Sequence, residues 1–187
     1  SSLLFYVGFS KKLENVAHHT LFFDVPFDIH AQAIYDNPQW PEDPLFYASF
    51  PSKTDANAAP DGQEAGIFLI PLAPGLDDIE EVREEYFEKI MGRFEHITNQ
   101  EVKKYVIFKK SFCIKDFIED YNSYKGNAYG LANTLLQTAF LRPSLKSKKV
   151  KGLYFTGQLT VPGPGVPPSL ISGKIVSSLI KKENANL

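Results

Sequence analysis

Short apolar and aromatic runs alternate along this chain with stretches rich in Pro, Asp, Asn and Ala. Runs of this kind, bounded by turn-forming residues, are typical of buried strands. They predict strands at 3–10, 45–50 and 66–73, and a fourth at 102–110 whose charged ends indicate that it emerges into solvent. The Pro-rich segments 24–44 and 51–65 are predicted to be loops.

The best helix signal lies between the third and fourth strands. Apolar residues recur there every three or four positions, with neighbours that widen the stripe: Ile79, Val82, Tyr86, Phe87, Ile90, Met91 and Phe94. Asp78 followed by Glu81 predicts a start of the capping-box type, and the acidic first turn suits the helix dipole. A shorter helix is predicted after Ser111. Sequential strands with inserted helices indicate an α+β fold, with a mixed, largely antiparallel sheet covered by helices on one face.

A different pattern begins near the C-terminus, where residues 151–180 read "KGLYFTGQLTVPGPGVPPSLISGKIVSSLI". A buried strand is predicted to end at Gly157, and a loop dense in Gly and Pro leads into a helix. Gly163 and Gly165 can adopt backbone angles that other residues avoid, and the prolines stiffen the loop. The helix is predicted to carry five apolar side chains inward: Leu170, Ile171, Ile175, Leu179 and Ile180.

This loop is a candidate site because of the backbone that it would present. Pro167 or Pro168 suits the first turn of a helix. The amides of residues 165–169, together with the positive end of the helix dipole, would then form a rigid site for an anion or a developing negative charge. The alternative is a proline-rich turn that only packs.

Composition narrows the classes of protein. The chain has 187 residues, 43% of them hydrophobic, which fits one large domain or a domain plus part of another. A net charge of −2 argues against a nucleic-acid surface. The basic cluster at 146–151 is interpreted as a solvated loop, with an anion or membrane contact as the alternative. No apolar run is long enough to span a bilayer. The chain begins without Met and enters a strand at once, as expected of a piece of a longer chain.

Other candidate chemistry is weak, and no catalytic acid, base or metal site is predicted. Adjacent residues of a strand point to opposite faces, so His18 and His19 are expected to form hydrogen bonds rather than share an ion. The single cysteine, Cys113, excludes a disulfide framework, is predicted to fill the core, and suits a reducing cytosol.

The C-terminal segment resembles the FAD-binding end of the phytoene desaturase family, the bacterial carotenoid desaturases within the amine-oxidase-like flavoproteins. The corresponding parts are the predicted strand 153–157, the "PGPGVP" loop at 162–167, and Ser172 followed by Gly173. Two further segments are similar to the family: "YNSYKGNAYGLANTLLQTAFLRP" at 121–143 and "LENVAHHTLFF" at 13–23.

The resemblance implies the C-terminal part of an FAD-dependent enzyme that removes a hydride and a proton from a polyene precursor to make conjugated double bonds. It implies a substrate-binding portion at 1–145 and an FAD-contacting strand and helix at 146–187. The implied cofactor-binding residues are Gly157, Gln158, Gly163, Gly165, Val166 and Pro167. The implied substrate-binding residues are Asn127, Tyr129, Leu131, Gln137 and Phe140.

One departure from the family is large, because the G-x-G-x-x-G motif that holds the FAD pyrophosphate does not occur in this chain. We therefore expect the isolated chain to bind FAD weakly or not at all and to be inactive. The alternatives are a carotenoid isomerase or retinol saturase-like flavoprotein, and a stand-alone binding domain without a cofactor. The expected partners are a hydrophobic polyene and a membrane surface rather than nucleic acid. The expected location is the cytoplasm, with membrane contact through 24–44, where the apolar candidates are Phe27, Ile29, Ile34 and Trp40.

Overall fold

The computed structural model describes residues 1–132, 134–138 and 141–185. The chain divides into two compact units, Ser1–Ala128, called unit 1, and Tyr129–Leu187, called unit 2. The predicted boundary between a substrate-binding portion, 1–145, and an FAD-contacting portion, 146–187, is a functional division and stays a prediction.

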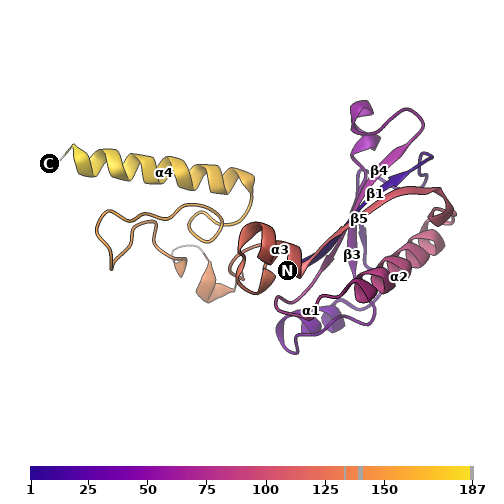
Figure 1. The fold of residues 1–187 in the computed structure, drawn as a ribbon, viewed down its shortest axis with the longest axis horizontal. Coiled ribbons are helices and arrows are strands. Elements are labelled where there is room, and N and C mark those ends of the chain that lie inside the picture. Colours follow the sequence, from indigo (N-terminus) through magenta and orange to yellow (C-terminus); the bar gives the residue numbers. More distant parts are fainter. Residues whose placement is uncertain (133, 139–140, 186–187) are drawn as a thin grey trace. The chain divides into compact units, whose positions relative to one another are not determined.

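Unit 1 is built on an antiparallel sheet of five strands in the order β2-β3-β4-β1-β5 (Figure 1). The strands are β1 (Ser2–Phe9), β2 (His19–Phe22), β3 (Phe46–Ser49), β4 (Glu64–Pro71) and β5 (Val106–Phe112). The neighbouring strands all pair antiparallel in the described sheet, so the predicted α+β class with a largely antiparallel sheet is confirmed. The four strands predicted between residues 3 and 110 are present, although the fourth, β5, begins at Val106 and not at 102. The strand β2, of four residues, was not predicted.

The α-helices are α1 (Phe27–Tyr35), α2 (Glu80–Thr98), α3 (Ile114–Tyr121) and α4 (Val166–Asn184). Shorter 3-10 turns lie at Pro51–Lys53, Ala56–Ala58, Lys103–Tyr105, Tyr124–Gly126 and Leu135–Gln137. The predicted helices α2, α3 and α4 are confirmed. The prediction that 24–44 is only loop was wrong: α1 lies within it, after Pro26 at its N-cap and with Asp28 in its first turn. The prolines around it concealed a helix of nine residues.

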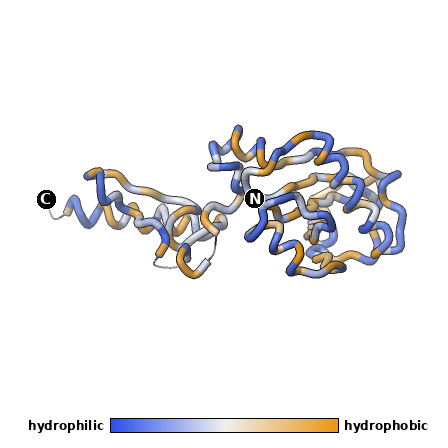
Figure 2. The backbone as a smooth tube through the Cα atoms, turned by 90° about the horizontal axis from the view of Figure 1, so that it is seen from below, coloured by the Kyte–Doolittle hydropathy of each residue, from blue (hydrophilic) through white to orange (hydrophobic). Residues whose placement is uncertain are grey.

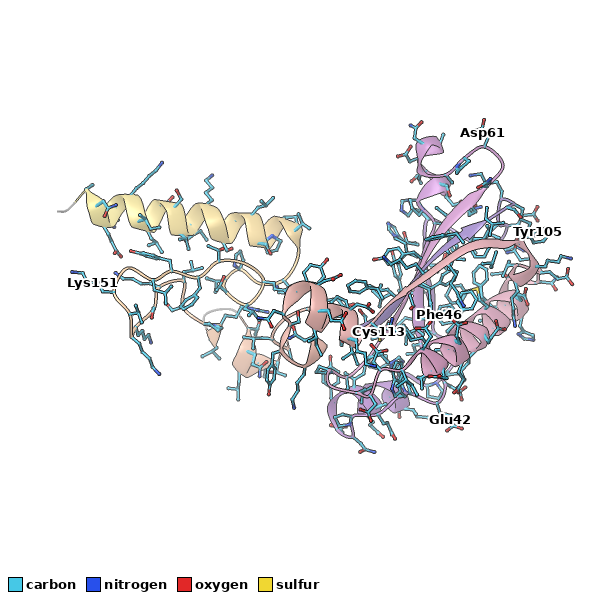
Figure 3. All side chains as sticks on the ribbon, viewed as in Figure 1. Glu42, Phe46, Asp61, Tyr105, Cys113 and Lys151 are labelled. Atoms are coloured by element: carbon cyan, nitrogen blue, oxygen red, sulfur yellow. The ribbon has the colours of Figure 1, made fainter. Side chains whose placement is uncertain are left out.

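The core of unit 1 lies between one face of the sheet and α2 (Figure 1). Phe94 of α2 meets Phe68 of β4 edge to face, with ring centroids 5.5 Å apart, and Phe5 of β1 meets Phe87 of α2 at 5.2 Å. Phe46, labelled in Figure 3, lies between the sheet and α2. Aromatic pairs of this geometry add to the free energy gained from burying apolar area.

The start of α2 differs from the predicted capping box. The N-cap is Ile79 and makes no side-chain cap bond. Asp78 instead receives two hydrogen bonds from Arg83, from Nε and Nη2, at 2.7 Å each, and one from the Lys115 amide at 2.8 Å. Burial disfavours ionised Asp78, but these bonds outweigh burial and hold its pKa below the ordinary value. Asp78 therefore joins α2 to α3 rather than capping α2.

His30 attaches α1 to the sheet through both ring nitrogens. Its Nδ1 accepts the Leu45 amide at 2.8 Å, which requires that Nε2 carry the proton and donate to the Pro71 carbonyl at 2.8 Å. Only a neutral imidazole can make both bonds. Burial, followed by the nearby positive charge of Arg93, lowers the pKa of His30 from its ordinary value, against the effect of the Pro71 carbonyl.

This geometry predicts that the chain loses stability in mild acid. Unfolded His30 protonates near pH 6.5 and folded His30 only below that, so its contribution is intact above pH 6.5 and declines as the pH falls toward the folded pKa. We expect the free energy of unfolding in urea to fall between pH 7.5 and 5.5. The His30→Gln variant should be less stable at pH 7.5 and should lose less over the same interval. An equal pH dependence in both proteins would contradict this role.

Candidate functional site

Residues 153–157, before α4, do not form the predicted strand. Their backbone pairing is limited, within the described structure, to a short contact. Lys146 and Tyr154 form an isolated bridge, extended by hydrogen bonds from the Ser147 amide to the Leu153 carbonyl and from the Phe155 amide to the Leu145 carbonyl, both 2.9 Å. The prediction of a buried strand was therefore wrong for the described structure. A strand needs a neighbour for its backbone groups, and among the described residues the backbone partners of 153–155 come from 145–147.

Gly157 begins a tight turn that is attached to α4. Its φ of +102° favours glycine, and a Cβ added there would meet no atom within 4 Å. Its amide donates to the Ser172 hydroxyl at 2.8 Å, and that hydroxyl donates to the Ser169 carbonyl at 2.6 Å. The Gly157 carbonyl accepts from the amide and the hydroxyl of Thr160. Ser172, fully buried, thus joins the turn to the helix.

The N-terminus of α4 presents fewer amide donors than predicted. Gly165 is the N-cap, with φ +114°, and Val166 and Pro167 open the helix, as the proline pattern predicted. Of residues 165–169, Pro167 and Pro168 have no N–H, and the Ser169 amide donates to the Gly165 carbonyl at 3.0 Å. The amides of Gly165 and Val166 remain without a partner among the described residues. The two adjacent amides could donate hydrogen bonds to an electron-rich edge of a ligand, and Gly157 has open space beside it.

Much of the apolar surface of α4 is exposed, contrary to the prediction. Leu170 and Ile171 are 71% and 48% exposed, whereas the buried residues of the helix are Ser172 and Val176. Within unit 2 the helix lies on irregular coil, which covers a narrower stripe than a sheet would. Hydrophilic residues gather at the C-terminal end of α4 (Figure 2). Glu183 there binds Lys146 Nζ and the Tyr154 hydroxyl, each at 2.6 Å.

The other two predicted cofactor residues contact an arginine. The Gln158 carbonyl accepts from Arg142 Nη1 at 3.2 Å. Gly163 is buried with φ +134°, and a Cβ placed on it would lie 3.4 Å from the Arg142 guanidinium carbon. Arg142 is 6% exposed. The sequence analysis named Arg142 only as part of the 121–143 segment. The signal that could have identified it is an arginine placed between an apolar run and a proline.

The predicted substrate residues do not share one element. Asn127 lies in unit 1, where its side-chain amide donates to the Tyr124 carbonyl at 2.8 Å. Tyr129, Leu131 and Gln137 lie in unit 2, and Gln137 ends a 3-10 turn. Phe140 lies outside the described residues. The role of this set in substrate binding stays a prediction.

The remaining candidate residues, His18, His19 and Cys113, make contacts within unit 1. The His18 and His19 rings lie only 4.2 Å apart, so the expectation of opposite faces was wrong: β2 begins at His19, and strand alternation does not govern His18. Each Nδ1 lies 2.6 Å from a hydroxyl, of Thr54 and Tyr47 respectively. Cys113 is fully buried, and burial raises its thiol pKa to about 12, which confirms its place in the core. The described part of the chain contains no group of three or more His, Cys, Asp and Glu that could hold a metal.

Comparison with known proteins places the chain among carotenoid desaturases. It is 46% identical over 174 residues to carotenoid 3,4-desaturase of Haloarcula japonica, covering 93% of this chain and 35% of that protein. It is 32% identical over 177 residues to the neurosporene-forming phytoene desaturase of Rhodobacter capsulatus, covering 92% and 34%. The zeta-carotene-forming phytoene desaturase of Myxococcus xanthus is 28% identical over 183 residues. No family model matches.

The chain therefore belongs to the carotenoid desaturase family, as its loop and helix motifs predicted. It spans about 35% of the length of the curated relatives that it matches. The identity extends over more than nine tenths of the chain, so both units belong to the matched region.

The Gly157–Ser172 contact generates a stability prediction. Ser172→Ala would leave the partly buried Gly157 amide without its acceptor, at a cost of about 1–3 kcal/mol, the range for donors that are shielded from water. We expect urea unfolding of the chain to show a loss of this size, and Ser177→Ala, at an exposed position of the same helix, to change stability by less than about 0.5 kcal/mol. Equal effects of the two substitutions would show that the contact contributes nothing.

Proposed function

We propose that the protein to which this chain belongs is an FAD-dependent carotenoid desaturase, and that this chain supplies its C-terminal part. The observation that carries the proposal is 46% identity to a carotenoid 3,4-desaturase across 93% of the chain. The amides of Gly165 and Val166, which have no partner within the described part of the chain, support it because they suit a cofactor that becomes more negative on reduction.

In this proposal the residues of the loop bind and orient the cofactor. Bound FAD supplies the hydride acceptor for converting a saturated carbon–carbon unit of a polyene into a double bond. The amides of Gly165 and Val166 stabilise negative charge at the edge that they face. Gly157 leaves space beside the turn, and the Gln158 side-chain amide can donate and accept hydrogen bonds without adding repulsion.

The substrate in this proposal is a hydrophobic polyene. Within unit 2, Tyr129, Leu131 and Gln137 supply part of the surface that binds it. The exposed Leu170 and Ile171 of α4 pack against the remainder of the protein, since a stable protein seldom leaves large contiguous apolar patches in water.

The test of the loop is Gly165→Val in the full-length protein loaded with FAD. The change places a branched side chain at a φ of +114° and beside the two amides, so it should lower FAD content or displace the donors. Loss of one such donor typically costs about 10²-fold in rate. We expect a lower flavin reduction potential and roughly a hundredfold slower desaturation of a polyene substrate.

The matched control is Gly152→Val, which strains a glycine at φ +79° in the same unit with no atom near its Cβ. It should lower stability and leave the flavin unchanged. If Gly165→Val retains normal flavin content, potential and turnover, the loop is only a turn.

A membrane surface is the proposed source of the substrate. Among the described residues, the helices are all too short or too polar to span a bilayer. Four apolar side chains near α1, however, are more than half exposed: Leu21, Phe23, Phe27 and Ile29. Phe23 and Phe27 stack with centroids 6.3 Å apart. Trp40 instead donates to the Asp77 carbonyl at 2.9 Å and packs on Tyr86, so it belongs with the core.

Flotation with vesicles tests this contact. The full-length protein should float with polyene-loaded vesicles, and Phe27→Ser with Ile29→Ser should reduce the bound fraction several-fold, since each exposed side chain would bury apolar area in the bilayer. Tyr124→Ser, which removes another exposed aromatic residue of unit 1, is the control. Equal flotation of all three proteins would remove α1 from the contact.

A further inference from the structure

Arg142 is a buried cation that touches two points of the loop before α4. It is 6% exposed and belongs to the irregular coil of unit 2, more than twenty residues before the helix. Its Nη1 donates to the Gln158 carbonyl at 3.2 Å, which holds one side of the loop. Its guanidinium also lies next to the position that a Cβ on Gly163 would occupy.

The backbone conformation at Gly163 favours a glycine, and the Arg142 guanidinium lies beside this position. A Cβ at this position would lie 3.4 Å from both Cζ and Nε of Arg142 and 3.5 Å from Nη2. These distances are ordinary van der Waals contacts, so the guanidinium would not exclude a Cβ. The φ of +134° is what makes this position unfavourable for other residues.

Arg142 also brings a positive charge to the loop before α4. A guanidinium stays protonated at all ordinary pH values, so the loop rests on a permanent positive charge. Gly163 is only two residues before Gly165, whose amide opens the donor pair at α4. A buried charge acts more strongly than an exposed one because water screens it less.

We propose that Arg142 is a positioning residue of the loop before α4: it holds the Gln158 backbone, lies beside Gly163, and its charge favours the reduced, more negative flavin. This rests on the proposed binding of FAD at the loop. Arg142 acts through the loop and is not assigned a contact with substrate.

The experiment compares Arg142→Gln and Arg142→Lys in the full-length, FAD-loaded protein. Reduction potential, FAD content and melting temperature are measured for each. Arg142→Gln removes the charge and should disfavour the reduced flavin at least tenfold, about 30 mV for a two-electron couple. Arg142→Lys keeps the charge and should retain most of the potential.

The matched control is Arg93→Gln in unit 1. Arg93 is a partly buried arginine, and the substitution breaks its ion pair with Asp24. It should lower the melting temperature and leave the flavin potential unchanged. A purely structural role for Arg142 would give the same pattern as this control, and that result overturns the proposal.

The remaining outcomes are also decisive. If Arg142→Gln loses flavin or fails to fold, the Arg142→Lys variant decides. A normal flavin reduction potential in that variant supports the role of the charge. A shifted reduction potential or a loss of flavin overturns the proposal. Equal shifts in both variants overturn it as well. If Gly165→Val changes flavin content or potential and Arg142→Gln changes neither, only this inference fails. If neither substitution affects the flavin, the proposed site itself fails.

Discussion

The burial of Phe94 among phenylalanines from separate parts of the sheet is the interaction on which unit 1 depends. Its ring lies 5.6 Å from that of Phe22 in β2, 5.9 Å from Phe50 just after β3, and 5.5 Å from Phe68 in β4. One side chain of α2 thus connects three segments that are far apart in the chain. Removal of a phenylalanine side chain from such a core typically costs about 3–5 kcal/mol, a large share of the stability of a domain.

Unit 2 is organised differently, because its described residues place the long helix α4 on irregular coil and not on a sheet. Polar contacts hold α4 in place: Ser172 binds the Gly157 turn, and Glu183 binds Lys146 and Tyr154. Lys151, labelled in Figure 3, belongs to the turn that joins Lys146 to Tyr154. Exposed ion pairs of this kind contribute little, so the buried Ser172 contact carries more of the stability. The same arrangement leaves the amides of Gly165 and Val166 without a partner among the residues that the structure describes.

Local signals predicted the elements well where one face of an element is buried. The apolar stripe of α2 and the apolar runs of β1, β3 and β4 correspond to the core that they form. They failed where a local motif competed with a distant partner. Asp78 has the sequence of a cap but binds Arg83 and the Lys115 amide, and α1 has a weak pattern because it buries only His30 and Ala33.

The sequence by itself determined the fold class, the family and the glycine conformations of the loop, because apolar periodicity and the absence of a Cβ act within a few residues. Only the tertiary structure decided which groups of the loop are available. Two of the five predicted amides belong to prolines, a third is used inside α4, and the buried cation beside Gly163 comes from a residue 21 positions earlier in the chain. Hydrogen bonds and charge act through space, and the distances between Arg142, Gln158 and Gly163 exist only once the coil has folded.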